Sequence, residues 1–126
     1  MLSANSAIVD EVRAAFDAYE SALLANDFDR LDQFFYNGPE TTRFGTKEIE
    51  RLYGHEQIST FRRSRGVIDQ RRTLNNLRIV ALNDSCAIAN VEYYPVNQKK
   101  IGRQTQVWMK LADEWKIISA HVSFGT

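Results

Sequence analysis

The sequence predicts an α+β fold in which N-terminal helices pack in a curved antiparallel sheet. Two observations support this prediction. Residues 100–126 are typical of a long β-hairpin, because two runs of β-branched, aromatic and polar residues flank the short polar turn at 112–114. The first third of the chain instead has apolar residues at helical spacing. Helices followed by such hairpins indicate a sheet wrapped around a helix, with a pocket between them.

The first helix is expected over residues 8–26. Its apolar residues recur at steps of three or four, which predicts one buried face: Ile8, Val12, Phe16, Tyr19 and Leu23. Asn5 or Ser6 can cap its start, and Asn26-Asp27 can end it.

A second, short helix and a third helix are expected next. Asp27 can cap the second, whose apolar side holds Phe28, Leu31, Phe34 and Phe35. Asn37-Gly38-Pro39 is expected to interrupt regular secondary structure before a brief strand at 41–44. A polar segment follows Gly45. The third helix is predicted over residues 55–65, between Gly54 and Gly66.

The rest of the chain reads as β-structure. Strands are predicted near residues 70–82, 86–95, 100–111 and 115–124. Their short links require neighbouring strands to be antiparallel. No segment repeats and no linker divides the chain, so residues 1–126 are expected to form a single domain.

Composition narrows the classes of function. Hydrophobic residues make up 44% of the 126 residues, and 16 basic and 16 acidic residues cancel, so bulk charge favours neither nucleic acid nor membrane partners. No window approaches the ~20 apolar residues of a membrane span. With Cys86 as the lone cysteine, the chain reads as cytoplasmic. His55 and His121 lack ligand spacing and there is no phosphate-binding glycine loop, so neither metal nor cofactor is expected.

Three polar residues stand where apolar ones would be expected. Tyr19 is either a core tyrosine or a phenol that projects into a cavity as a hydrogen-bond donor or acid. Arg43 is either exposed or paired with a carboxylate in the structural interpretation. In the functional interpretation it points inward, and its guanidinium is a fixed fork of donors that suits a substrate carboxylate. His121 is structural or catalytic, and the pattern of the last strand does not say which of its faces holds the cavity.

The only cluster of basic residues is Phe61-Arg62-Arg63-Ser64-Arg65, followed by Arg71-Arg72. It reads either as a solvated helix end, where cations favour the helix dipole, or as part of an anion site through Arg62 or Arg65.

An ordered set of motifs between Phe16 and Phe124 resembles the AtzH-like family of small NTF2-like (SnoaL-like) proteins. This family includes 1,3-dicarboxyurea deamidase and the small protein of oxalurate catabolism. The motifs are Tyr19-Glu20-x-Ala22-Leu23, Asn26-Asp27, Thr42-Arg43-Phe44-Gly45, Leu52-Tyr53-Gly54, Ile58-x-x-Phe61-Arg62-x-x-Arg65, Gly102-Arg103-Gln104-x-Gln106-x-Trp108 and Ala120-His121-Val122-Ser123.

The resemblance implies an NTF2-like, cystatin-like cone, usually a homodimer, with the pocket inside the cone. It also implies that Tyr19 and Arg43 form an active-site pair. Tyr36 replaces a usual tryptophan, Phe44 replaces a usual tyrosine, and the segment between Gly45 and Leu52 is longer than usual. These departures leave the fold intact and alter the pocket.

We therefore expect a cofactor-free amidohydrolase or deamidase that acts on a carboxylated urea or ureido acid. Arg43 would bind the substrate carboxylate and Tyr19 would act as hydrogen-bond donor or acid, with His121 or Glu20 as the base. Further substrate contacts are assigned to Phe35, Tyr53, Phe61, Arg65 and Gln104. The alternative is a non-catalytic protein that binds a small anion or assists a ureide or oxalurate pathway.

Overall fold

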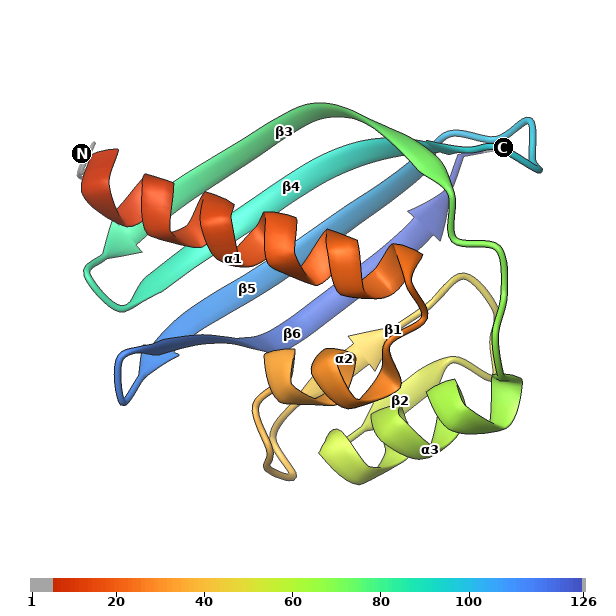
Figure 1. Cartoon of the computed structure of the whole chain (residues 1–126), viewed down its shortest axis with the longest axis horizontal. Coiled ribbons are helices and arrows are strands. Elements are labelled where there is room, and N and C mark those ends of the chain that lie inside the picture. The colour runs from red at the N-terminus through yellow and green to blue at the C-terminus, as the bar shows by residue number, and fades with distance from the viewer. Residues whose placement is uncertain (1–5, 126) are drawn as a thin grey trace.

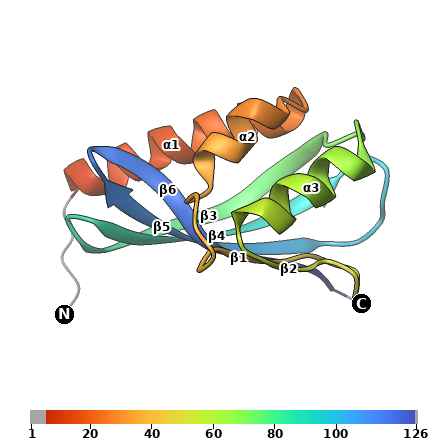
Figure 2. The ribbon, with the colours of Figure 1, turned by 90° about the horizontal axis from the view of Figure 1, so that it is seen from below.

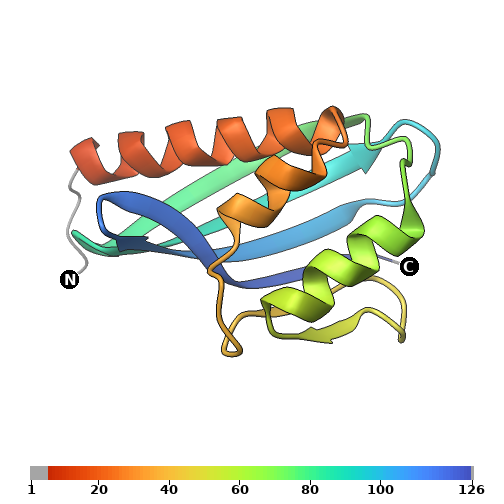
Figure 3. The same ribbon diagram turned by 60° about the horizontal axis from the view of Figure 1, so that its bottom comes forward.

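One curved sheet carries three helices on the same side in the computed structural model, which describes residues 6–125 (Figures 1, 2 and 3). The elements are α1 Ser6–Leu24, α2 Phe28–Phe34, β1 Thr42–Phe44, β2 Arg51–Tyr53, α3 His55–Arg65, β3 Arg72–Asn83, β4 Cys86–Pro95, β5 Gly102–Leu111 and β6 Glu114–Phe124. The α+β class is confirmed, and the four long strands form the antiparallel meander that the sequence predicted.

The strand order is β2-β1-β6-β5-β4-β3. Strand β1 runs parallel to β6 and antiparallel to β2, so the sheet is mixed at this edge. The parallel pair was not foreseen, because β1 comes from the helical third of the chain. Strand β2 was also missed, since it has only three residues and buries only Leu52.

The core lies between α1 and the sheet. The predicted face of α1 is buried, and Phe16 meets the fully buried Trp108 of β5 and Ile117 of β6 in one apolar cluster. Asn26 takes a positive φ of 51° just beyond α1, and Asp27 caps α2 by accepting a hydrogen bond from the backbone N–H of Arg30, as predicted. Among the described residues, no helix combines the length and the apolar character needed to cross a membrane.

A β-bulge in β6 decides which side chains face inward. Val107 pairs with Ser119 and Trp108 pairs with Ile117, so Ile118 has no partner on β5. The inner face therefore carries Ile117 before the bulge and Ala120 after it. Simple alternation along the whole strand would put Ile117 and His121 on one face. The structure separates them.

His121 consequently lies on the outer side of the sheet. It is exposed, and its ring packs edge-on against Phe44 of β1 at 5.7 Å between centroids. The homodimer predicted for this chain remains a prediction.

We expect Ile117→Val to lower the free energy of unfolding by about 1 kcal/mol, because it deletes a fully buried methylene from a close-packed core. The same change at Ile49, which is 74% exposed, is the matched control and should alter stability by less than about 0.5 kcal/mol. Urea unfolding followed by circular dichroism measures both. Equal effects would contradict this description of the core.

Candidate active site

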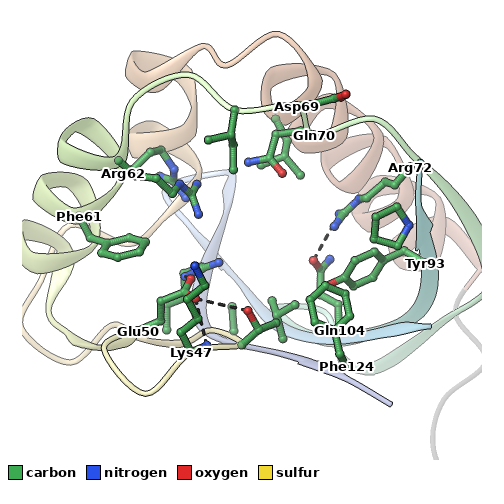
Figure 4. Close-up of a pocket in the computed structure, with 18 of the residues that line it drawn as sticks. Lys47, Glu50, Phe61, Arg62, Asp69, Gln70, Arg72, Tyr93, Gln104 and Phe124 are labelled. Carbon is green, nitrogen blue, oxygen red and sulfur yellow. Dashed lines mark hydrogen bonds and ion pairs between the residues drawn. The ribbon is translucent and has the colours of Figure 1, made fainter. Parts of the chain in front are cut away.

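A cavity of about 370 Å³ lies between helices α1 and α3 and the inner face of the sheet (Figure 4). Its key polar side chains come from five separate segments: Tyr19 of α1, Arg43 of β1, Glu50 of the loop before β2, Arg62 of α3 and Gln104 of β5. Because the whole fold contributes, the site cannot form from a local segment.

Tyr19 joins the core to the cavity. Its ring is 5% exposed and packs edge-on against Phe34, Phe35 and Trp108, with centroids 5.8, 6.1 and 6.4 Å away. The hydroxyl has no hydrogen-bond partner among the described residues, and Tyr19 lines the cavity. Packing therefore fixes the ring while the hydroxyl is left for a ligand.

Arg43 points inward and is paired with an acid at the same time. It stands between Leu52 of β2 and Ala120 of β6, and its side chain is 15% exposed. Its Nη1 donates to Oε1 of Glu50 at 3.3 Å. Glu50 uses one edge of the guanidinium, so the remaining N–H groups can meet a ligand.

Arg62 is a buried cation, and two of its guanidinium nitrogens lack a hydrogen-bond partner. Its side chain is 5% exposed, and neither Nε nor Nη1 has a hydrogen-bond partner among the described residues. The carboxylate of Asp32 lies 3.7 Å from Nη1, but Asp32 accepts hydrogen bonds from Ser59 and Arg63 instead. Burial lowers the pKa of Arg62. A buried charge in this state is costly unless an anion joins it.

The opposite wall holds a second unpaired donor. Arg72 pairs with Glu20, and its Nη2 donates to Oε1 of Gln104 at 3.3 Å. This leaves Nε2 of Gln104 buried without a partner. Tyr93 lies under the guanidinium of Arg72, 4.5 Å from the ring centroid, and burial raises the pKa of Tyr93.

Positive charge dominates the lining. Among its described residues are six basic side chains (Arg43, Lys47, Arg62, Arg65, Arg71 and Arg72) and two acidic ones (Glu50 and Asp69). Burial lowers the pKa of Arg65, and the nearby charge of Arg43 lowers it further. Within residues 6–125, no three His, Cys, Asp or Glu side chains gather in a group that could hold a metal ion. The cavity is therefore suited to a small anion.

The structure brings together most of the residues that the sequence selected. Tyr19, Arg43, Phe61, Arg65 and Gln104 all line this cavity.

Three other selected residues lie elsewhere. His121 is exposed on the outer face, because of the bulge in β6. Tyr53 is 57% exposed and lines a separate groove between β2 and α3. Phe35 is buried beneath the site, where its ring contacts Tyr19 and the guanidinium of Arg62 at 5.4 Å. Glu20, considered as a base, is buried in its pair with Arg72.

Sequence reasoning missed Glu50, because it lies in a polar segment without regular spacing. Its one local signal is Gly45, where an added Cβ would stand 2.3 Å from Oε1 of Glu50. Glycine is thus needed here to admit the carboxylate.

The fold and the cavity define an α+β protein of the NTF2-like, cystatin-like class. The AtzH-like family model matches residues 3–126, and the chain belongs to this family. No curated protein matches it.

Three crystal structures are similar over nearly the whole of this chain. A protein of unknown function from Pectobacterium atrosepticum is 38% identical, with a TM-score of 0.91, over 97% of this chain and 94% of that chain. A cystatin-like fold protein from Burkholderia xenovorans is 34% identical, with a TM-score of 0.89, over 95% and 93%. An NTF2-like protein of unknown function from Pseudomonas putida is 16% identical over 98% and 89%, and its TM-score of 0.79 shows the fold alone.

We expect Arg62→Met to raise the free energy of unfolding by about 1 kcal/mol, since an apolar side chain of similar length replaces a buried, unsatisfied cation. We expect malonate to raise the melting temperature of the wild type, and the same change should abolish that rise. Arg13→Met, at an exposed position of α1, is the control and should keep the malonate effect. A variant at Arg62 that malonate stabilises normally would contradict the role of Arg62 in anion binding.

Proposed function

We propose that the protein is a small cofactor-free amidohydrolase, a deamidase that acts on a carboxylated urea or a related ureido acid. The observation that carries this proposal is that the free hydroxyl of Tyr19 and the guanidinium of Arg43 line one positively charged cavity. Membership of the AtzH-like family supports it.

In this proposal the cations select and orient the substrate. Arg43 presents the N–H groups that Glu50 leaves open, and these bind the substrate carboxylate as a fixed fork. Arg62 adds a second, more deeply buried charge from α3. A cavity of about 370 Å³ has ample room for a molecule as small as a ureido acid.

Tyr19 supplies the polar group at the reacting centre. Its hydroxyl donates to the amide carbonyl oxygen as negative charge develops there, or protonates the departing nitrogen, while water attacks the carbonyl carbon. Because three aromatic rings hold Tyr19 in place, the donor is oriented before the substrate arrives. The C–N bond then breaks and ammonia leaves.

The alternative is a non-catalytic protein that binds a small anion or serves a ureide pathway as an accessory. The observation in its favour is that the described lining residues include no serine, cysteine or histidine that could act as nucleophile. Carboxylated ureas, biuret-like acids and oxalurate form the test panel, with ammonia release as the readout. Binding without release across the panel favours the accessory role.

We expect Tyr19→Phe to lower kcat about 10²-fold or more, because one donor to the developing oxyanion is lost while the ring contacts remain. Ammonia release from the responsive panel substrate measures this. Tyr94→Phe, which removes a hydroxyl from a residue 39% exposed on β4, is the matched control. Full turnover by the Tyr19 variant would rule out this role.

We expect Arg43→Lys to lower kcat/KM about 10- to 100-fold, because a charge-assisted hydrogen bond is worth about 1.5–3 kcal/mol and lysine cannot make the two-pronged contact. Steady-state kinetics with the same substrate measure it. Arg51→Lys, at an exposed position of β2, should behave like the wild type. Equal kinetics for the two variants would exclude Arg43 from carboxylate binding.

A further inference from the structure

We infer that Glu50 is the general base that takes a proton from the attacking water. This inference rests on the proposed hydrolysis and supplies the residue that the hydrolysis lacks. Glu50 and Asp69 are the two carboxylates among the described lining residues of the cavity.

Asp69 is poorly suited to the role. Both of its carboxylate oxygens accept hydrogen bonds from Arg71, whose side chain is 75% exposed, so the pair lies toward solvent. The hydrogen bonds from Arg71 lower the pKa of Asp69 to about 2, which makes it a weak proton acceptor at neutral pH.

The bases considered from the sequence lie outside the cavity lining. His121 is exposed on the outer face of the sheet. Glu20 is buried and held by the guanidinium of Arg72. Neither can reach a water inside the cavity without rearrangement of the fold, whereas the side chain of Glu50 already points into it (Figure 4).

The surroundings of Glu50 fix its carboxylate and leave one of its lone-pair positions open. Oε1 accepts from Nη1 of Arg43 at 3.3 Å, and Oε2 accepts from the backbone N–H of Lys47 at 3.1 Å and from Oγ1 of Thr46 at 3.4 Å. A carboxylate offers about four lone-pair positions, so these three donors leave one for water. The contacts from Arg43 and Thr46 are longer than the normal range, and the contact from Lys47 is at its long end.

The pairing with Arg43 also places the base beside the substrate. Arg43 holds the substrate carboxylate in the proposed complex, and Glu50 contacts the same guanidinium. A water bound to Glu50 therefore lies next to the substrate in the proposed complex.

The proton balance closes within these residues. Glu50 takes one proton from water, and the remaining hydroxide forms the C–O bond at the amide carbonyl carbon. The C–N bond breaks as the Tyr19 hydroxyl gives its proton to the leaving nitrogen, which departs as ammonia. Arg62, which interacts electrostatically with Tyr19, stabilises the phenolate until the proton on Glu50 returns to it through water.

The test is Glu50→Gln, assayed for ammonia release with the panel substrate that the wild type hydrolyses. We expect kcat to fall about 10²- to 10⁴-fold, the usual contribution of a general base. KM should stay the same or fall, because the variant removes a negative charge beside Arg43. Glu48→Gln makes the same change at an exposed position of the same loop and should leave both constants unchanged.

Each outcome decides a different claim. Absence of turnover by the wild type on the whole panel overturns the hydrolase proposal and this inference together. Wild-type kcat in Glu50→Gln overturns the inference alone. A raised KM, with malonate binding lost, overturns it as well, because Glu50 would then only position Arg43.

A second variant guards against a folding defect. Glu50→Asp keeps the charge that pairs with Arg43 and withdraws the carboxylate by one methylene. If Glu50→Gln shows no cooperative melting transition, Glu50→Asp is assayed in its place. We expect kcat to fall at least tenfold in this folded variant with KM unchanged, and unchanged kcat overturns the inference.

Discussion

The surplus of positive charge inside the cavity is the constraint on which the rest of the site depends. Glu50 offsets part of the charge of Arg43, and Glu20 offsets that of Arg72, but Arg62 remains buried without a hydrogen bond to Nε or Nη1. Folding must hold this cation against its own cost of desolvation. Such an arrangement is understandable if an anionic ligand completes the site and restores the lost solvation.

The apolar core provides the rigidity that this constraint requires. Tyr19 shares its ring contacts with Trp108, which fills the centre of the sheet, and Phe35 lies between the core and Arg62. Parallel pairing of β1 with β6 then brings Arg43 beside Ala120 on the inner face. The same packing that stabilises the fold therefore positions both the phenol and the guanidinium.

The helices, the long strands and the separate candidates Tyr19 and Arg43 could be predicted from the sequence, because each follows or breaks a regular pattern. The pairing of Tyr19 with Arg43 came from the resemblance to the AtzH-like family. The sequence placed His121 in the last strand but did not show which face of the sheet it occupies. One unpaired residue, Ile118, reverses the alternation of inward and outward side chains in β6. Glu50 could not be found by pattern at all. Hydrogen bonds within residues 45–50 and a tertiary contact with Arg43 position Glu50. Neither kind of contact produces a periodic pattern of residues in the sequence.

Binding and hydrolysis make different demands on this cavity. Anion binding requires only the surplus of guanidinium groups, and for that purpose an acid inside the cavity is a disadvantage, because it competes with the ligand for Arg43. Glu50 is nevertheless 6% exposed, and Gly45 leaves room for its side chain. A buried acid beside Arg43 offsets the cost of burying that guanidinium, and the proposed hydrolysis gives it a second use. In the proposed hydrolysis the same acid deprotonates water next to the bound carboxylate, a task that the accessory role does not require.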